Sequence, residues 1–296
     1  MSFTPIDLSL LPAPTVVETL DFDTIRDAMI DDLQTRDTTF TALVESDPAY
    51  KIIEVAAYRE LLIRQRVNDA ARAVMLAYAA GTDLEQLGGL FGVTRNVITP
   101  ADSTAVPPTD AVMESDTDLR KRIQLSLEGL ATAGPVGAYR FHALSISDVL
   151  DVSITSPNPG DVLVSVLSRT GDGTPSAETL DEVRSALNAE DVRPLTDNVI
   201  VQGAELVKYS IQATIYTYTG PDPDTVISAS QAAADTYVAS QHKLGLDVTL
   251  SGIYAALHQS GVQRVALASP TADIVISPIQ ASYCTGITLT NGGTAA

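Results

Sequence analysis

The sequence predicts an α+β protein: an N-terminal region in which long helices form a bundle, followed by two small related α/β units, each a helix with an antiparallel hairpin. Three observations support this prediction. Apolar residues before residue 80 recur at spacings of three and four, as in helices that pack side by side. Apolar and polar residues alternate over 207–219, as in a half-buried strand. The stretch that begins at Gly137 recurs from Gly252.

The composition limits the classes of function. Lys and Arg number 18 against 37 acidic residues, which gives a net charge of −19, and the sequence has no basic stripe. Such a chain repels phosphate backbones, so no nucleic-acid partner is expected. With 45% apolar residues over 296 positions, the chain can bury substantial cores.

Neither a secretory signal nor a membrane span is expected. The first residues lack a basic start followed by an apolar run. The longest apolar stretch, Val74 to Ala80, is far shorter than the ~20 residues that a span needs. The one cysteine, Cys284, cannot form an internal disulfide, which fits folding in a reducing compartment. We therefore expect a soluble protein that is made in the cytosol and has no membrane partner.

Residues 1–20 are predicted to be an extended arm, because prolines interrupt any helix there while apolar residues supply contacts. The arm could fold onto its own domain or reach over a neighbouring subunit. A short helix follows, capped by Asp21 or Asp23. Its apolar face consists of Ile25, Met29 and Leu33. A long helix then begins at Asp47 and Pro48, a good cap followed by a good first helical residue.

The long helix is expected to end at Ala80, a length of ~50 Å at 1.5 Å per residue. One line of residues along it, here called the seam, has the spacing of helices that pack side by side. The seam consists of Ile53, Ala56, Ile63, Val67, Ala70, Val74 and Ala77. Glu60 is its one polar interruption, and its alanines allow a partner helix to approach closely. The seam predicts a helical bundle, within this chain or between chains. The shortage of other long helices nearby favours partner chains.

A second, brief helix is expected after Gly81, with Thr82 and Glu85 as a capping box. Its inward residues are predicted to be Leu84, Leu87 and Leu90. Residues 93–116, rich in proline and small polar residues, indicate a linker or a hairpin.

The next helix starts near Asp116, with Leu119, Ile123 and Leu127 predicted to face inward. It carries a basic triplet in an otherwise acidic chain, Arg120, Lys121 and Arg122. This triplet is either a solvated helix face or a docking site.

From Pro135 the pattern becomes α/β. Helices are expected over 135–146, 176–189, 223–241 and 249–259, and strands over 149–155, 162–167, 198–202, 207–219, 262–268 and 273–277. The predicted domains are an arm (1–20), a helical core-bundle region (21–92), a linker or hairpin (93–116), two α/β domains (117–204 and 205–280) and a C-terminal tail (281–296).

The internal repeat aligns the two α/β units in detail. Val149 falls on Val262, and Asp161 to Ser165 falls on Asp273 to Ser277. Two units of related design indicate a scaffold.

The residues indicate no catalytic, cofactor-binding or metal site. Gly171 and Gly173 stand between a strand and a helix, but Ser176 occupies the place of the third glycine of a dinucleotide loop, so a local turn is the better interpretation. The three histidines, His142, His242 and His258, lie in separate elements. Cys284 has no evident base beside it, and nothing selects a pair of carboxylates for acid–base chemistry.

Three stretches in order carry a family resemblance: "AYRELLIRQRVNDAARAVMLAYAAGTDLEQLGGLFGVTR" from Ala57, "ESDTDLRKRI" from Glu114, and "GDGTPSAETLDEVRSALNAEDVRPLTDNVIVQGAELVKYSIQATI" from Gly171. Together they resemble the baseplate assembly protein J family of contractile-tailed phages and phage-tail-like bacteriocins. The resemblance extends over about residues 20 to 280.

The resemblance implies a structural subunit of the baseplate wedge in a virion tail, assembled in the host cytoplasm. In this family paired copies join a smaller tail protein in a helical core bundle. Other domains link neighbouring wedges into a six-fold ring around the tube, and this ring starts sheath contraction. By this analogy the seam belongs to the core bundle and the α/β units carry contacts between wedges. Tube, hub and sheath proteins are further candidate partners.

Two other functions remain open from the residues alone. One is a tail-associated hydrolase that attacks cell wall or polysaccharide through a carboxylate pair. The other is a receptor-binding tail protein. The absence of Trp and the 5% aromatic content speak against sugar recognition, which usually stacks rings on aromatic faces.

Overall fold

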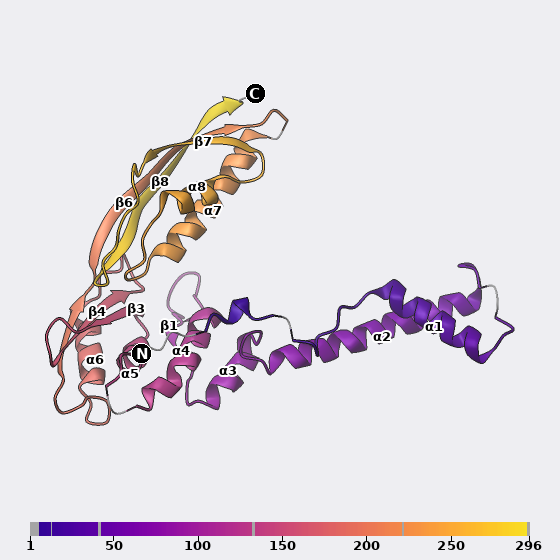
Figure 1. Ribbon diagram of the computed structural model, residues 1–296, viewed down its shortest axis with the longest axis horizontal. Helices are drawn as coiled ribbons and strands as arrows, with labels where there is room; N and C mark the ends of the chain where they lie inside the picture. The colour runs from indigo at the N-terminus through magenta and orange to yellow at the C-terminus, as the bar shows by residue number, and fades with distance from the viewer. Residues whose placement is uncertain (1–5, 13, 41–42, 132–133, 221, 295–296) are drawn as a thin grey trace. The chain divides into compact units, whose positions relative to one another are not determined.

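The computed structural model describes residues 6–12, 14–40, 43–131, 134–220 and 222–294 and confirms an α+β protein (Figure 1). The chain divides into two compact units. The helical unit holds the described residues up to Arg95 together with 115–124, and the sheet unit holds 96–114 and the described residues from Leu125 onward.

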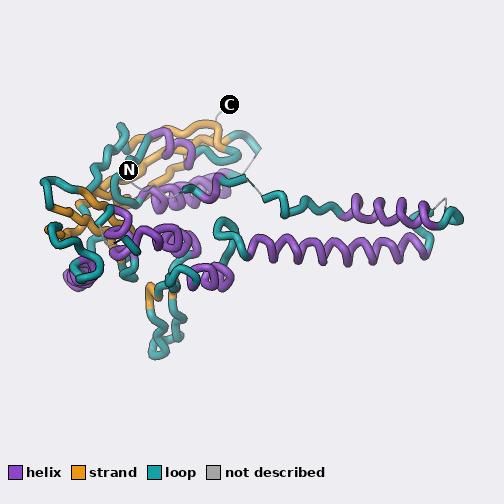
Figure 2. The backbone as a smooth tube through the Cα atoms, turned by 60° about the horizontal axis from the view of Figure 1, so that its bottom comes forward, coloured by secondary structure: helices purple, strands orange, loops and turns teal. Residues whose placement is uncertain are grey.

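The helical unit is built around a pair of helices, α1 (Phe22–Arg36) and α2 (Pro48–Ala73), that lie side by side (Figure 2). A short 3-10 turn, η1 (Leu8–Leu10), precedes them. Both helix starts follow the predicted caps. The Asp21 carboxylate accepts a hydrogen bond from Thr24 N at 2.8 Å, and that of Asp47 accepts one from Ala49 N at 2.8 Å. Pro48 occupies the first turn of α2, where its missing N–H costs no hydrogen bond.

The long helix ends earlier than predicted, at Ala73 rather than Ala80. The chain then forms turns in which Met75 N donates to Arg72 O and Tyr78 N to Met75 O. Val74 and Ala77, the last two seam residues, therefore lie outside the helix.

Three further predictions, about helix α3 and the helix after it, are wrong in detail. Helix α3 (Gly81–Gly89) is capped by Ala80 with no side-chain hydrogen bond, and Glu85 binds Arg95 in place of a capping box. Among the residues expected to face inward, Leu84 and Leu119 are fully buried and Ile123 is nearly so. Leu90 and Leu127, in contrast, are 79% and 64% exposed. Helix α4 (Asp116–Gly129) packs close to the end of α3, where a β-carbon on Gly88 would lie 3.2 Å from Ile123.

The sheet unit begins with a hairpin arm, in which β1 (Val97–Thr99) pairs with β2 (Val112–Met113). Of the two predictions for residues 93–116, the hairpin is thus confirmed. The first three-stranded sheet has the order β3-β4-β5. Its elements are β3 (Val149–Thr155), β4 (Asp161–Ser168), β5 (Asn198–Gly203) and the helices α5 (Val136–Leu144) and α6 (Ala177–Leu187). Strands β3 and β4 are antiparallel, whereas β4 and β5 are parallel.

The second sheet has the order β7-β6-β8. Its elements are β6 (Glu205–Thr217), β7 (Val262–Ser269), β8 (Gln280–Thr294) and the helices α7 (Pro223–Gln241) and α8 (Leu250–Leu257). The alternation predicted for β6 is observed: its odd-numbered residues from Tyr209 to Thr217 are buried under the helices, and its even-numbered residues lie on the open face. Figure 1 shows α7 and α8 together on one side of this sheet.

The predicted unit of a helix with an antiparallel hairpin forms at the first copy of the repeat, where α5 precedes the antiparallel strands β3 and β4. In the second copy α8 and β7 form, but residues 273–277 make no strand, and β7 pairs with β6 instead. The reason is that Asp273 and Ile276 form hydrogen bonds with Leu250 and Asp247 in place of a neighbouring strand. The Asp273 carboxylate accepts from Leu250 N at 2.6 Å, and Ile276 N donates to Asp247 at 2.7 Å. Residues 281–294, predicted to be a tail, form most of β8, parallel to β6.

Candidate subunit interface

One face of α2 is covered by its own chain. Ala57 is fully buried, and Ile25 of α1 is nearly so. Further along, the side-chain amide of Asn68 donates to Glu18 O at 2.9 Å, and Asn68 Oδ1 accepts from Glu18 N at 3.0 Å. Arg64 adds an ion pair with Glu18 at 3.3 Å. Of the two interpretations of the arm, this part therefore folds onto its own unit.

The opposite face of α2 carries an exposed band of aliphatic side chains, here called the apolar stripe. The exposed fractions are 70% for Ile52, 65% for Val55, 43% for Leu62, 65% for Ile63 and 57% for Val67, and the smaller Ala56 and Ala70 are also exposed. Single apolar residues are common on protein surfaces, but a contiguous band marks an interaction site. Burying one such side chain is worth about 1.5–3 kcal/mol, so a partner helix would gain several such increments.

The predicted seam coincides with the apolar stripe only in part. Ala56, Ile63, Val67 and Ala70 belong to both, while Ile53 is half-buried. Glu60 lies towards α1 and binds Arg64 at 2.6 Å, in a groove that also contains Ile25 and Met29. The physical reason is that a strict 3.5-residue repeat drifts around a straight α-helix of 3.6 residues per turn.

Sequence reasoning missed Ile52 and Val55 as members of the stripe. Both are strongly exposed. They could have been found by considering an apolar sector of the helix wider than the single line of seam positions. Val74, at the C-terminal cap of α2, is 71% exposed. Ala77 lines a groove of about 510 Å³ whose other residues are Ile6, Asp7, Leu8, Thr117, Arg120, Lys121 and Gln124.

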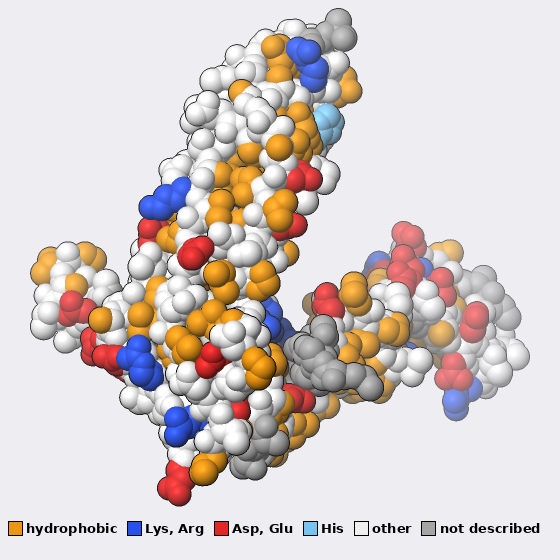
Figure 3. Space-filling model, turned by 60° about the vertical axis from the view of Figure 1, so that its left-hand side comes forward, with side chains coloured by type: hydrophobic (Ala, Val, Ile, Leu, Met, Phe, Trp, Pro, Cys, Tyr) orange, Lys and Arg blue, Asp and Glu red, His pale blue; other side chains and the backbone are white. Residues whose placement is uncertain are grey.

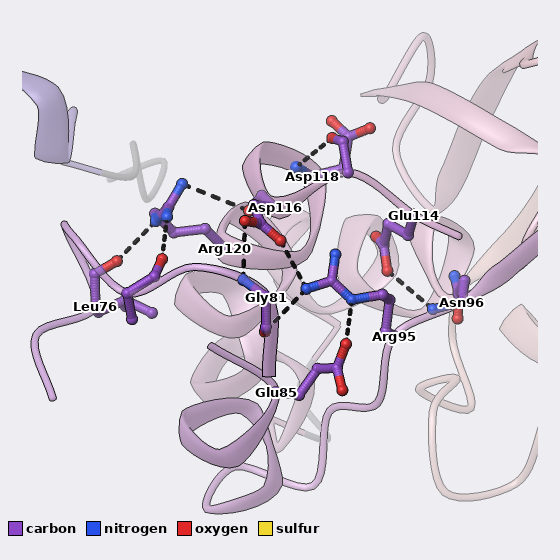
Figure 4. A network of polar contacts seen from close by, with 11 residues as sticks. Leu76, Gly81, Glu85, Arg95, Asn96, Glu114, Asp116, Asp118 and Arg120 are labelled. Atoms are coloured by element: carbon purple, nitrogen blue, oxygen red, sulfur yellow. Dashed lines mark hydrogen bonds and ion pairs between the residues drawn. The ribbon is translucent and has the colours of Figure 1, made fainter. Parts of the chain in front are cut away.

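A charged network holds the segment that follows α2 (Figure 4). Arg95, whose side chain is only 9% exposed, donates to Glu85 from Nε and to Asp116 from Nη2, both at 2.6 Å. Its Nη2 also lies 3.2 Å from Gly81 O, and Gly81 N donates to the other oxygen of Asp116 at 3.0 Å. The hydrogen bond from Gly81 N and the Arg95 guanidinium lower the pKa of Asp116 below its ordinary value. The network thereby ties α3 to the start of α4.

The basic triplet on α4 is divided between internal and external roles. Arg120 donates to Leu76 O at 2.7 Å and to Ala79 O at 2.6 Å, which stabilises the turns that end α2. Arg122 is buried and donates to Thr94 O. The Lys121 side chain is 50% exposed, with Asp118 3.8 Å away. Lys121 is therefore the member of the triplet that is available to a partner.

Three family models match successive parts of the chain. They are the baseplate J-like N-terminal domain over residues 45–102, the central domain over 131–203 and the C-terminal domain over 209–290. The chain is also 52% identical to baseplate protein J of Escherichia phage P2 over 296 aligned positions, which cover 97% of this chain and 98% of that protein.

The chain belongs to the baseplate J-like family.

Among solved structures, this baseplate J-like chain is similar to a chain of the anti-feeding prophage baseplate, determined by cryo-electron microscopy with six-fold symmetry applied. The identity is 15% and the TM-score is 0.39, over 60% of this chain and 44% of that chain.

Two of the three histidines of the baseplate J-like chain contact backbone carbonyl groups within the fold. His142 Nε2 lies 3.2 Å from Gly129 O, and His242 Nδ1 lies 2.6 Å from Ser282 O. Gly171 and Gly173 both have positive φ, 63° and 97°, as the predicted local turn requires. Within the described ranges, no three His, Cys, Asp or Glu side chains converge as metal ligands would. No described helix has the length and apolar character of a membrane span.

Proposed function

We propose that this chain is a structural subunit of the baseplate wedge in a contractile phage tail or tail-like particle, and that its place is the virion. The observation that carries the proposal is the apolar stripe. One face of α2 is covered by α1 and the arm, while the other presents aliphatic side chains along the helix. A partner that covered the exposed face would stabilise this helix further.

The proposed occupants of the stripe are a second copy of the chain and a smaller tail protein, joined in a helical core bundle. Alanines 56 and 70 support this arrangement, because small residues let helix axes approach closely. The sheet unit would link neighbouring wedges into a six-fold ring around the tube, with tube, hub and sheath proteins as further contacts. The baseplate identity of the P2 relative supports this assignment.

For the trigger of contraction we propose a hinge. The described chain passes between the two units at three points, after Arg95, after Glu114 and after Gln124. Small changes of backbone angle in the 93–116 connection, together with a bend of α4 at the third crossing, would reorient the sheet unit while the bundle stays intact. Packed units that move as rigid bodies commonly switch in this way.

A charge placed in the apolar stripe tests the proposal. Ile63→Glu should abolish co-purification with the smaller tail protein and stop assembly of baseplates as seen by electron microscopy. Gln65→Glu adds the same charge at an exposed position away from the stripe and should leave both intact. Normal assembly by the Ile63→Glu chain, with an unchanged circular dichroism spectrum, would contradict the proposal.

The competing hydrolase function makes a different prediction. It requires that the purified chain release sugars or peptides from cell wall or polysaccharide, and that an acid-to-amide substitution abolish the release without disturbing assembly. A release assay on the wild-type chain separates the two functions.

A further inference from the structure

Strand β8 presents an open backbone edge for most of its length. The strand pairs with β6 on one side only. On its other side, the first residues are covered by a neighbouring segment: Leu244 bridges to Ala281, Gly245 N donates to Gln280 O, and His242 contacts Ser282 O. Beyond Ser282, no backbone partner occupies this side among the described residues.

This open edge lacks the charged residues and prolines that commonly protect edge strands. Natural edges carry charged residues or prolines that prevent another strand from pairing with them. The 15 residues of β8 include no Lys, Arg, Asp, Glu or Pro. The opposite edge, β7, differs because it carries Arg264, whose guanidinium stacks on the Tyr216 ring at 4.1 Å. Figure 3 shows one face of the molecule, on which charged side chains are scattered among hydrophobic and uncharged polar ones.

The regular part of the edge is short and well defined. Register irregularities interrupt the β6–β8 pairing on both sides of residues 287–291, where the ladder itself is continuous from Ile211–Ile287 to Ile215–Asn291. Within it, Ile287 and Leu289 are half-buried on the helix side, while Thr288 and Thr290 are exposed on the open face. An extended strand could therefore add to these residues without displacing any described part of the chain.

We infer that the edge of β8 around Thr288 pairs antiparallel with the same edge of a second copy of this chain. Two copies that each carry a charge of −19 repel overall, and an edge without charged residues is the place where this repulsion opposes pairing least. The strand is also self-complementary. With the two-fold axis at Thr288, Ile287 lies beside the partner's Leu289 and Thr288 beside the partner's Thr288. Aliphatic residues then meet aliphatic residues, and Thr–Thr pairs are favourable across strands.

The result is a continuous six-stranded sheet with the helices of both copies on one face. The interface is isologous, as expected for a closed two-fold contact. Because the paired strands are short, the buried area falls below that of a standard stable interface. We expect a weak dimer with a dissociation constant on the order of micromolar. This contact is independent of the apolar stripe on α2.

Disulfide cross-linking tests the inferred register directly. In a full-length chain with Cys284→Ser, the Thr288→Cys variant should form a covalent dimer on mild oxidation, because directly opposed residues lie within disulfide distance. The matched control is Gln212→Cys, the exposed neighbour of Thr288 on the central strand β6, one strand away from the edge. It should not cross-link. Equal yields for the two variants, or no dimer for Thr288→Cys, would overturn the inference.

Sedimentation provides a second, non-covalent measurement. The wild-type chain should show a concentration-dependent monomer–dimer equilibrium. Thr288→Lys should raise the dissociation constant by about tenfold or more, because two like charges would lie opposite each other. Gln212→Lys adds the same charge to the same face and should leave the constant unchanged. A dimer that persists unaltered in Thr288→Lys forms elsewhere, through α2 for example, and would also overturn the inference.

Discussion

Asn68 and Glu18, fifty residues apart, are joined by two reciprocal hydrogen bonds of 2.9 and 3.0 Å. The Asn68 side chain binds the Glu18 backbone as a neighbouring strand would: its amide donates to the Glu18 carbonyl, and its oxygen accepts from the Glu18 N–H. Asn68 is only 3% exposed, so both of its polar groups depend on this pairing. The contact fixes the arm on the covered face of α2 and leaves the apolar stripe free.

Asn68→Ala should release the arm. Two hydrogen bonds are lost, and the Glu18 backbone groups must find water, which costs about 1–3 kcal/mol. Amide hydrogen exchange should show faster exchange at Glu18 and along residues 14–20. Gln65→Ala, which removes an exposed side chain that bonds to Asp69, should leave the arm protected. Unchanged protection of Glu18 in Asn68→Ala would show that other contacts hold the arm.

Replacing both stripe alanines, Ala56→Leu and Ala70→Leu, should separate folding from assembly. Both positions are exposed on an isolated chain, so the melting temperature should change little. In the proposed bundle the larger side chains overpack the contact, at about 1–3 kcal/mol per site. Co-purification with the smaller tail protein should therefore be lost while the chain stays folded. Gln65→Leu, away from the stripe, is the control. Full recovery of the complex by the double variant would count against close helix packing at these sites.

The Arg95–Asp116 pair should make stability depend on pH. The pKa of Asp116 is lowered in the folded chain, so its contribution is fully present above the ordinary carboxyl pKa of about 3.9. The contribution is lost as pH falls through the lowered folded value. Asp116→Asn should therefore be less stable than wild type at about pH 6, by roughly 1–2 kcal/mol because the carboxylate is partly exposed. The difference should shrink below about pH 4. Denaturant unfolding of both chains at both pH values measures this difference in unfolding free energy. A difference that does not vary with pH would contradict the ionic explanation.

The basic triplet should divide into structural and docking residues. Arg120→Ala removes the donors to Leu76 O and Ala79 O and should cost about 1–3 kcal/mol in unfolding free energy. Lys121→Ala should stay within about 0.5 kcal/mol of wild type, because its side chain is half exposed.

The docking hypothesis for the triplet then depends on Lys121. If a partner binds there, Lys121→Glu should weaken baseplate assembly without lowering the melting temperature. Asp118→Asn, a neighbouring charge change that makes the surface less acidic, should not weaken it. Normal assembly by the Lys121→Glu chain would leave the triplet with a structural role only.

The apolar stripe was partly predictable, because some of its features depend on local sequence and others on contacts between distant parts of the chain. Ile63, Val67 and Ala70 could be found, since helical periodicity alone places them on one face. Helical periodicity could not predict which face of α2 stays exposed to solvent. That choice depends on α1 and on Glu18, which approach from distant parts of the chain.

The sequence by itself determined where elements begin and which strands alternate. Asp21 and Asp47 cap their helices through bonds to residues two or three positions away, so the information is local. Only the tertiary structure showed that α2 ends at Ala73, because the turns that follow are held by Arg120, which lies 44 residues from Leu76 and donates to Leu76 O and Ala79 O. The same holds for β8. Its residues alternate apolar and polar only over Ile287 to Thr290, and the whole strand forms because the backbone of β6, more than seventy residues earlier, offers hydrogen bonds that no local segment can supply.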